Sequence, residues 1–471
     1  MQILSFPLLL SVVLLALLNN NQAIFLLAAL AGSGTGIYGF LLFLRRPHLV
    51  CFANLMAVSL LLGYALGTII YAGGGLFSTA DLNMTETIEF GYAQSDLSFS
   101  LLLIYVVCSV LFSFSRLESP IFETGQIFAS FALPKARLLI WVGIGMVMAA
   151  FAVGDLGYMG TQANESLNVT VLGAMSGLLV PILLPMSALC FIDETSRWRR
   201  ILLFLAFFLF LFSLVLLGRR VLLYSIVNLM IALAVSGRKL PKFGWTKWTA
   251  IGLSAIGLML FLYIGFYFFY ALRLSIDNLG LETGLVNLLY ATVDLLQNEF
   301  SGVGVELSSN SMERPFILSY LAAFVGAQSI YPPLWGEELV YAIKVAIPSL
   351  IYPEKTILLP SMVEEFVHPA FGFHVFDGPN SIVTAGLNDF GLIGVLLYPV
   401  LLVMAYAAVR RLLYGRLPSF IYYFVMFRLI FQVLYVEQSL AGLLTSALRD
   451  LALIKVGLYF ICNLPSFKRS S

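Results

Sequence analysis

Charged residues are scarce in this sequence. Asp, Glu, Lys and Arg make up only 11% of the 471 residues, whereas hydrophobic residues make up 60%. The mean hydropathy of +0.96 lies far outside the range of a soluble globular domain. The 26 basic residues nearly balance the 25 acidic ones, so the basic excess of a nucleic-acid-binding protein is absent. The composition therefore indicates an integral membrane protein and argues against nucleic acid as a partner.

Cysteine and histidine are also scarce, with four and three residues. The four cysteines each lie in or at the end of an apolar run, and no two of them form a CxxC pair. The three histidines form neither an HExxH motif nor a cluster with cysteine. We therefore expect no disulfide framework, no structural zinc site and no cofactor.

Long apolar runs dominate the rest of the chain. A helix needs about 20 apolar residues to cross a hydrocarbon core of about 30 Å. Twelve runs approach this length: 2–18, 22–44, 49–72, 97–115, 137–154, 170–192, 200–217, 219–236, 247–270, 380–408, 418–436 and 440–462. Asn19, Asn20 and Asn21 follow the first run where a cleavage site would need small residues, so we expect a span and not a signal peptide. The predicted fold class is an all-α polytopic membrane protein with about 12 transmembrane helices.

Basic residues separate the connecting segments into two sets. Seventeen of the 26 fall in alternate segments, namely 45–46, 116–137, 197–200, 238–247, 410–416 and 468–469. The other segments hold six basic residues and 19 of the 25 acidic ones. Because short cytoplasmic loops are rich in Lys and Arg, we expect the first set and both termini to be cytoplasmic.

These spans divide the chain into three regions. Residues 1–270 form a nine-helix transmembrane region, residues 271–379 a large extracytoplasmic loop, and residues 380–471 a three-helix transmembrane region with a cytoplasmic tail. The loop carries four basic and twelve acidic residues, and its stretches 286–300, 316–330 and 338–350 have the period of amphipathic helices. Stretch 316–330 is either an interfacial or re-entrant segment or a buried loop helix, because another crossing would invert the basic segment 410–416.

Three arginines stand where charge is costly. Arg219 and Arg220 follow Gly218 at a predicted outer turn between two apolar runs, and Arg273 emerges after the ninth run. The guanidinium fork suits a phosphate or diphosphate. The same side chains could instead snorkel to lipid headgroups. We hypothesise that at least one of the three binds an anion.

Candidate proton acceptors lie in the large loop. His368 and Asp377 stand just before the tenth run, and Glu299 follows the first amphipathic stretch. An imidazole or carboxylate can accept a proton from a reacting hydroxyl; the alternative for His368 is packing among its aromatic neighbours. The sequence does not rank the remaining loop carboxylates, which include Glu306, Glu337, Glu338, Glu364 and Glu365.

Four groups of short motifs follow one another along the chain. They are GDLGYMG at 154–160, LGRRVLL at 217–223, GAQS at 326–329 with AIPSLIYPEK at 346–355, and PNSIVT at 379–384 with NDFGLIG at 388–394. In these motifs and in its layout, the chain resembles the bacterial oligosaccharide repeat-unit polymerases, the Wzy-type enzymes of O-antigen, capsule and exopolysaccharide synthesis. It departs from them at Ser349, where the family often has arginine, and at Ala385, near which the family often has an acidic residue. Asp389 is an acidic residue close by.

The resemblance implies a C-type glycosyltransferase-like membrane fold in the bacterial inner membrane, with its active site facing the periplasm. Undecaprenyl-diphosphate-linked oligosaccharides would be the substrates, with membrane lipids and a chain-length regulator as further partners. On this interpretation Arg219, Arg220 and Arg273 stabilise the leaving diphosphate, and Glu299, His368 or Asp377 accepts the proton of the attacking sugar hydroxyl.

Two other functions remain open. An O-antigen ligase-like transferase would use the same donor, and only its acceptor would differ. A lipid-linked oligosaccharide flippase or other transporter should place ionisable residues at mid-membrane. The candidates within the apolar runs are Asp389, Arg428, Arg449, Asp450 and Lys455.

Overall fold

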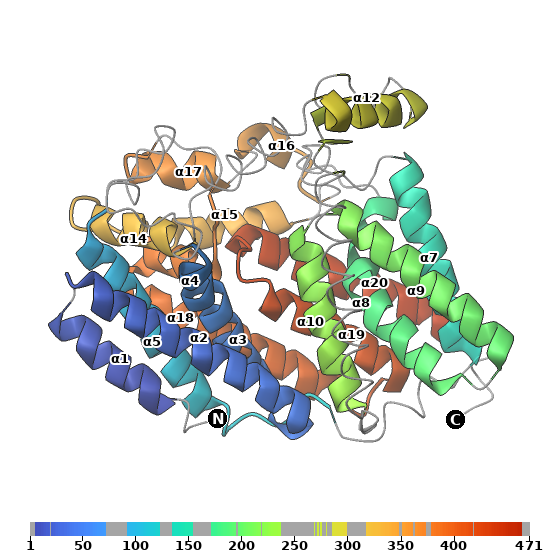
Figure 1. Cartoon of the computed structure of the whole chain (residues 1–471), viewed down its shortest axis with the longest axis horizontal. Helices are drawn as coiled ribbons and strands as arrows, with labels where there is room; N and C mark the ends of the chain where they lie inside the picture. The colour runs from blue at the N-terminus through green and yellow to red at the C-terminus, as the bar shows by residue number, and fades with distance from the viewer. Residues whose placement is uncertain are drawn as a thin grey trace.

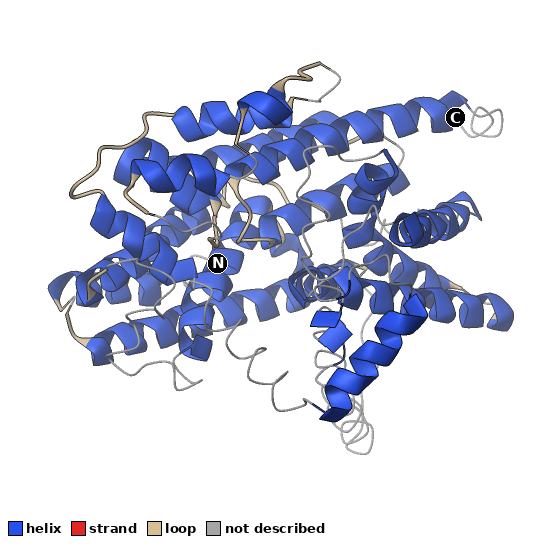
Figure 2. Ribbon diagram, turned by 90° about the horizontal axis from the view of Figure 1, so that it is seen from above, coloured by secondary structure: helices blue, strands red, loops and turns tan. Residues whose placement is uncertain are grey.

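The computed structural model describes most of the chain. The described residues are 5–18, 20–71, 92–122, 134–153, 171–194, 196–217, 219–236, 268, 271–272, 274–275, 279, 285–298, 317–347, 351–360, 363–373, 378–417 and 419–463. All regular elements within these ranges are helices (Figure 2). The all-α prediction is therefore confirmed for the described part of the chain.

Helices cover eleven of the twelve predicted spans. They are α1 (Ser5–Leu17), α2 (Gln22–Arg45), α3 (Phe52–Leu60) with the π-helical turn η3 (Leu61–Leu66) and α4 (Gly67–Tyr71), α5 (Gln94–Phe114), α7 (Pro134–Val153), α8 (Val171–Asp193), α9 (Arg197–Leu217), α10 (Arg219–Val235), α18 (Ile382–Leu413), α19 (Ser419–Leu434) and α20 (Leu440–Asn463). The ninth predicted span, 247–270, lies almost wholly outside the described residues.

Five helical stretches are long and apolar enough to cross a membrane: Gln22–Arg45, Phe52–Ile69, Gln94–Phe114, Val171–Phe191 and Ile382–Leu413. Shorter apolar helices, among them α1 and α10, accompany them. The described part of the chain is thus all-helical and suits a membrane protein, and the count of twelve crossings stays a prediction.

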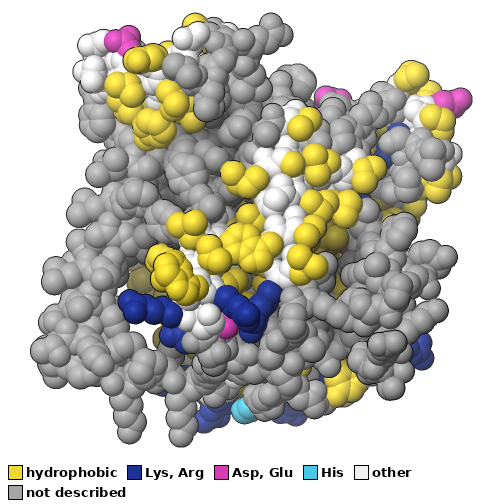
Figure 3. All heavy atoms as spheres, turned by 90° about the vertical axis from the view of Figure 1, so that its right-hand side faces the viewer, with side chains coloured by type: hydrophobic (Ala, Val, Ile, Leu, Met, Phe, Trp, Pro, Cys, Tyr) yellow, Lys and Arg dark blue, Asp and Glu magenta, His cyan; other side chains and the backbone are white. Residues whose placement is uncertain are grey.

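Large apolar side chains face outward on the surface formed by α7 and α9. Trp141 and Met148 of α7 and Phe204 of α9 are exposed, as are many of their neighbours. Figure 3 shows this face, with Lys and Arg side chains gathered below the apolar ones. An exposed apolar surface of this extent suits contact with lipid and not with water.

The helices run between two opposite ends of the molecule. At one end, the Ile121 amide, after α5, donates to the Val50 carbonyl, after α2, at 2.9 Å. Tyr422, at the start of α19, donates to the Ile121 carbonyl at the same end, at 2.8 Å. Farther along the helices, the Tyr64 hydroxyl of η3 lies 2.7 Å from the Ser381 hydroxyl, which precedes α18. Segments predicted to share a side of the membrane therefore meet at one end.

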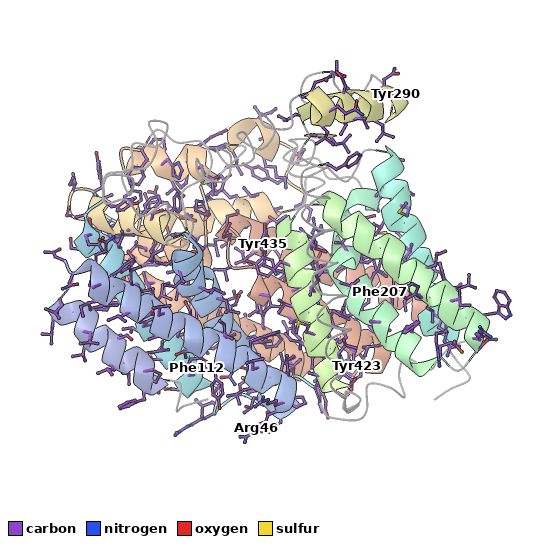
Figure 4. All side chains as sticks on the ribbon, in the orientation of Figure 1. Arg46, Phe112, Phe207, Tyr290, Tyr423 and Tyr435 are labelled. Atoms are coloured by element: carbon purple, nitrogen blue, oxygen red, sulfur yellow. The ribbon has the colours of Figure 1, made fainter. Side chains whose placement is uncertain are left out.

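The two ends differ in the residues that they carry. Arg46, after α2, and Tyr290, on α12 (Leu285–Asn298), lie at opposite ends of the molecule (Figure 4). The end with Arg46 is called the basic end, because Arg410 and Arg411 also lie there, beside Ser119. The opposite end, with α12, is called the loop end. Which end faces the cytoplasm is a prediction from the charge distribution.

A layer of short helices covers the loop end. It contains α12, α14 (Ile317–Ala327), α15 (Glu337–Ala346), α16 (Lys355–Leu358) and α17 (Val363–Ala370), which lie along the upper side in Figure 1. The three predicted amphipathic stretches correspond to α12, α14 and α15. Helix α14 is buried on nearly all sides and packs against α5 and α18. The interfacial or re-entrant segment and the buried loop helix both stay predictions for this stretch.

The helix within the predicted tenth span, 380–408, is interrupted, a feature that the sequence analysis did not predict. Phe390 and Gly391 interrupt α18, and Gly391 has φ 59° and ψ −145°, a conformation open to glycine. Gly386 and Gly394, which would be about 12 Å apart in a straight helix, are in backbone contact, with no room for a Cβ atom at either. The chain therefore turns back sharply between a short half, 382–389, and a long half, 392–413.

Candidate functional site

The bend in α18 places a buried carboxylate against the start of α15. Asp389, the last residue of the short half, is fully buried. Its Oδ1 accepts a hydrogen bond from the Glu338 amide at 2.9 Å, and its Oδ2 accepts from the Leu339 amide at 2.9 Å. The Tyr398 hydroxyl donates to the same Oδ2 at 2.6 Å. Asp389 thus serves as the N-terminal cap of α15 from a distant part of the chain.

The segment between α14 and α15 caps the short half in return. The Leu334 amide donates to the Asn388 carbonyl at 2.8 Å, and Gln328 Nε2 donates to the Leu387 carbonyl at 2.5 Å. These carbonyls belong to the last turn of the short half and would otherwise lack partners. Two helix ends from different regions of the sequence therefore fix each other.

The C-terminal end of α15 is held by a buried lysine. Lys355 is only 5% exposed, and its Nζ donates to the carbonyls of Val345 and Ile347 at 2.9 and 2.8 Å. A cation at this position also interacts favourably with the helix dipole. Helix α15 is therefore anchored at both ends.

Glu338 is a buried carboxyl group with a strongly raised pKa in this arrangement. Its residue is 1% exposed, and its Oε2 accepts a hydrogen bond from Asn388 Nδ2 at 3.0 Å. Burial raises the pKa of the Glu338 carboxyl to about 8; the Asn388 bond opposes the rise, and the carboxylates of Asp389 and Glu364 add to it. A carboxyl group with such a pKa exchanges its proton near neutral pH, as catalytic acids and bases do.

A second chain of hydrogen bonds lies nearby. The Tyr320 hydroxyl of α14 donates to Asn380 Oδ1 at 2.7 Å, and Asn380 Nδ2 in turn donates to Glu364. The same hydroxyl lies 2.7 Å from His368 Nε2. Because the hydroxyl proton points to Asn380, the arrangement favours a proton on Nε2 of His368.

The structure describes only part of the predicted site. His368, on α17, is 1% exposed and packs against the rings of Phe324 and Phe373, in addition to its contact with the Tyr320 hydroxyl. Arg219 and Arg220 form the first turn of α10, and their side chains lie outside the described ones. Arg273, Glu299 and Asp377 also lie outside the described residues.

A cavity of about 500 Å³ lies at the loop end between the start of α5, α14 and the segment after α17. Its walls are largely aromatic or apolar, with Tyr92, Tyr331, Phe371 and Phe373 among them and Asp96 as the acidic group. Glu338 does not line it. Among the described residues, no group of three His, Cys, Asp or Glu side chains could hold a metal ion.

A separate cluster lies in the middle of the helices. Arg428 of α19 and Asp450 of α20 form a buried ion pair with Nε to Oδ2 at 2.5 Å. Gln432 Nε2 donates to the same Oδ2 at 3.3 Å, and the Tyr406 hydroxyl donates to Gln432 Oε1 at 2.9 Å. Arg449 also approaches Asp450, at 3.4 Å. Arg428, Arg449 and Asp450 are three of the five ionisable residues that the sequence analysis named within the apolar runs; their pairing was not predicted.

Sequence reasoning named Glu338 but did not rank it. The signal was present, because Glu338 precedes Tyr341, Ala342 and Val345 by three, four and seven residues and shares their buried face. Its neighbour Glu337 falls on the exposed side of the same helix.

Comparison with known proteins adds no family. No family model, curated protein or solved structure matches this chain. The resemblance to the repeat-unit polymerases therefore depends on the quoted motifs and on the layout of spans and loop.

Proposed function

We propose that this chain is a membrane glycosyltransferase that polymerises glycan repeat units. It would transfer a growing glycan from undecaprenyl diphosphate to a sugar hydroxyl of a lipid-linked repeat unit. The observation that carries the proposal is Glu338, a buried carboxyl with a pKa of about 8 on a helix fixed at both ends, within the layer over the loop end. A lipid-linked substrate could keep its tail between the helices and present its sugars to this layer.

The transfer needs a proton acceptor and a partner for the leaving group. The acceptor hydroxyl oxygen forms a bond to the anomeric carbon of the donor sugar, and its proton passes to the Glu338 carboxylate. The bond from that carbon to the diphosphate oxygen breaks, and its electron pair leaves with the diphosphate. Because Glu338 is buried here, the proposal requires α15 or α17 to shift when a sugar binds. Glu299, His368 and Asp377 remain predicted acceptors.

Arginines would stabilise the negative charge on the departing diphosphate. Helix α10 begins at Arg219, and the Tyr224 ring, five residues later, lies 5.2 Å from the Tyr435 ring at the loop end of α19. The first turn of α10 is therefore at the same end of the molecule as Glu338. A helix N-terminus also favours an anion through its free amides.

A polymerisation assay tests the proposal. Purified chain is incubated with undecaprenyl-diphosphate-linked repeat unit, and the products are separated by gel electrophoresis. We expect a ladder of lengthening glycans from the wild type and from Glu337→Gln, whose exposed carboxyl lies in the same helical turn. Glu338→Gln should lose at least tenfold in rate, since general base catalysis contributes roughly 100-fold or more. No ladder from the wild type, with transfer to a lipid A core acceptor instead, would indicate the ligase function.

A lipid-linked oligosaccharide transporter is the second candidate, because Arg428 and Asp450 form a buried pair in the middle of the helices. Such pairs often mark transport pathways. Movement of a fluorescent lipid-linked oligosaccharide across proteoliposomes, abolished by Asp450→Asn and unaffected by Glu338→Gln, would favour this function over polymerisation.

A further inference from the structure

A pocket of about 540 Å³ lies at the basic end, opposite the carboxylates of the loop end. Three segments that are distant in sequence form it, following α2, following α5 and ending α18. Its lining residues are His48, Ser119, Pro120, Phe122, Arg410, Arg411 and Tyr414. Two arginines and a histidine thus line it, and none of these described residues is acidic.

Arg410 has unsatisfied donor capacity at this pocket. The residue is 8% exposed, and its guanidinium carbon lies 5.7 Å from the centre of the Tyr414 ring. Its Nε is a buried donor without an acceptor among the described residues. Buried polar atoms are nearly always hydrogen-bonded, so an exception calls for an explanation such as an absent ligand.

The acidic residue near Arg410 is Glu118, whose carboxylate accepts hydrogen bonds from other groups. Glu118 is close enough for Arg410 to lower the pKa of its carboxyl, against the larger opposite effect of burial. However, its Oε1 accepts from the Phe52 amide and its Oε2 from the Ala53 amide, each at 2.9 Å. Glu118 therefore caps the start of α3 and forms no ion pair with Arg410. The pocket keeps a positive charge.

We infer that this pocket binds a phosphate group, carried by an anionic phospholipid headgroup or by a soluble phosphate. The guanidinium groups of Arg410 and Arg411 supply planar donors that match phosphate oxygens, and the Ser119 hydroxyl adds another donor. Phe122 and Tyr414 form an apolar wall beside them, which suits the glycerol backbone of a lipid. Basic pockets between transmembrane helices on the cytoplasmic side bind anionic headgroups in this way.

This site is independent of the proposed polymerase activity. It lies at the opposite end of the helices from Glu338 and shares no lining residue with the loop-end cavity. The result of either test therefore leaves the other proposal untouched.

Two binding measurements distinguish the sources of the phosphate. In the first, inorganic phosphate is titrated into the full chain in neutral detergent at constant ionic strength, and the heat of binding is recorded. In the second, native mass spectrometry compares retention of phosphatidylglycerol with retention of phosphatidylcholine. Saturable phosphate binding identifies a soluble ligand, whereas selective retention of phosphatidylglycerol alone identifies a headgroup. If neither binds, the proposal is wrong.

Matched variants test whether binding occurs at this pocket. Arg411→Gln should weaken binding about tenfold, the loss expected for one charge-assisted hydrogen bond. Its side chain is exposed, so the fold should be retained, which an unchanged melting temperature without ligand would verify. Arg410→Gln should weaken binding at least as much. Arg416→Gln removes an exposed charge from the same segment outside the pocket and should bind as the wild type does. Equal weakening by Arg416→Gln would mean diffuse surface attraction and would overturn the proposal.

Discussion

Asp389 accepts a hydrogen bond from the backbone amide of Glu338 at 2.9 Å, and its negative charge also raises the pKa of the Glu338 side chain. One carboxylate therefore both anchors α15 and makes the neighbouring carboxyl easier to protonate. The hydrogen bond involves the backbone of Glu338, whereas the charge acts on its side chain. Substitutions of Glu338 and of Asp389 should therefore have different consequences.

Glu338 should make the stability of the protein depend on pH. The pKa of the Glu338 carboxyl is about 8 in the folded chain, against an ordinary value of 4.5. Below pH 4.5 the group is protonated in both the folded and the unfolded chain, and its stabilising contribution to the free energy of unfolding is then fully present. Between about 4.5 and 8 the unfolded chain has lost this proton while the folded chain keeps it. The free energy of unfolding should therefore fall as pH rises, by at most about 1.4 kcal/mol per pH unit.

Glu338→Gln should remove this part of the pH dependence, whereas Glu337→Gln should retain it. Denaturant unfolding in detergent at about pH 5 and about pH 8 would compare the variants. Identical pH profiles for the two would show that Glu338 does not titrate in this range. In the polymerisation assay, the wild-type rate should rise with pH through an apparent pKa near 8, because the base must be ionised.

Asp389→Ala should destabilise the loop layer more than Asp389→Asn does. Alanine removes the cap of α15, which costs about 1 kcal/mol, and leaves the buried Tyr398 hydroxyl without its acceptor, which costs a further ~1–3 kcal/mol. Asparagine keeps one acceptor oxygen and should recover part of the loss. Hydrogen exchange of α15 measures this locally, and equal exchange in the wild type and both variants would exclude the capping role.

The sequence predicted the positions of the long helices well, because a helix that crosses a membrane needs a run of about 20 apolar residues, and such runs are visible in the sequence. It did not predict the bend in α18, since glycines such as Gly386, Gly391 and Gly394 are also compatible with a straight helix. The contact between Asp389 and α15 joins residues about 50 positions apart, which no local pattern encodes. Glu338 was within reach, because its spacing from Tyr341 and Val345 assigns it to the buried face.

The charge distribution predicts which end faces the cytoplasm. Leu117, at the basic end, and Tyr290, on α12, are both well exposed, at 71% and 74%. In intact cells an impermeant maleimide should label Tyr290→Cys and should label Leu117→Cys only after permeabilisation. The native cysteines Cys51, Cys108 and Cys190 are buried and should add little background. Labelling of Leu117→Cys in intact cells would invert the topology.

The Arg428–Asp450 pair should respond differently to single and double substitution. Either Arg428→Met or Asp450→Leu leaves a buried charge unpaired, which costs about 3–5 kcal/mol. The double variant removes both charges and should recover most of the lost stability in thermal unfolding. If the double variant is stable and still forms a glycan ladder, the pair is structural. If the double variant is stable and loses only the transport of lipid-linked oligosaccharide, the transporter function gains support.

The last prediction separates diphosphate binding from lipid anchoring at Arg219. Lysine keeps the positive charge and can still reach the headgroups, but it loses the planar fork that binds two phosphate oxygens. A headgroup anchor should therefore tolerate Arg219→Lys, while a diphosphate ligand should not. The loss of one charge-assisted hydrogen bond, roughly 1.5–3 kcal/mol, corresponds to a rate about ten- to a hundred-fold lower.

We expect this loss for at least one of Arg219, Arg220 and Arg273, with a larger loss for the alanine variant at the same position. Expression and melting temperature should change little, and Arg416→Lys, at the basic end, serves as the matched control. The rates must be measured with substrate below saturation, because tighter or weaker substrate binding is otherwise hidden. Wild-type rates from all three lysine variants would mean that these arginines do not bind the diphosphate, and the leaving group would then need another cation.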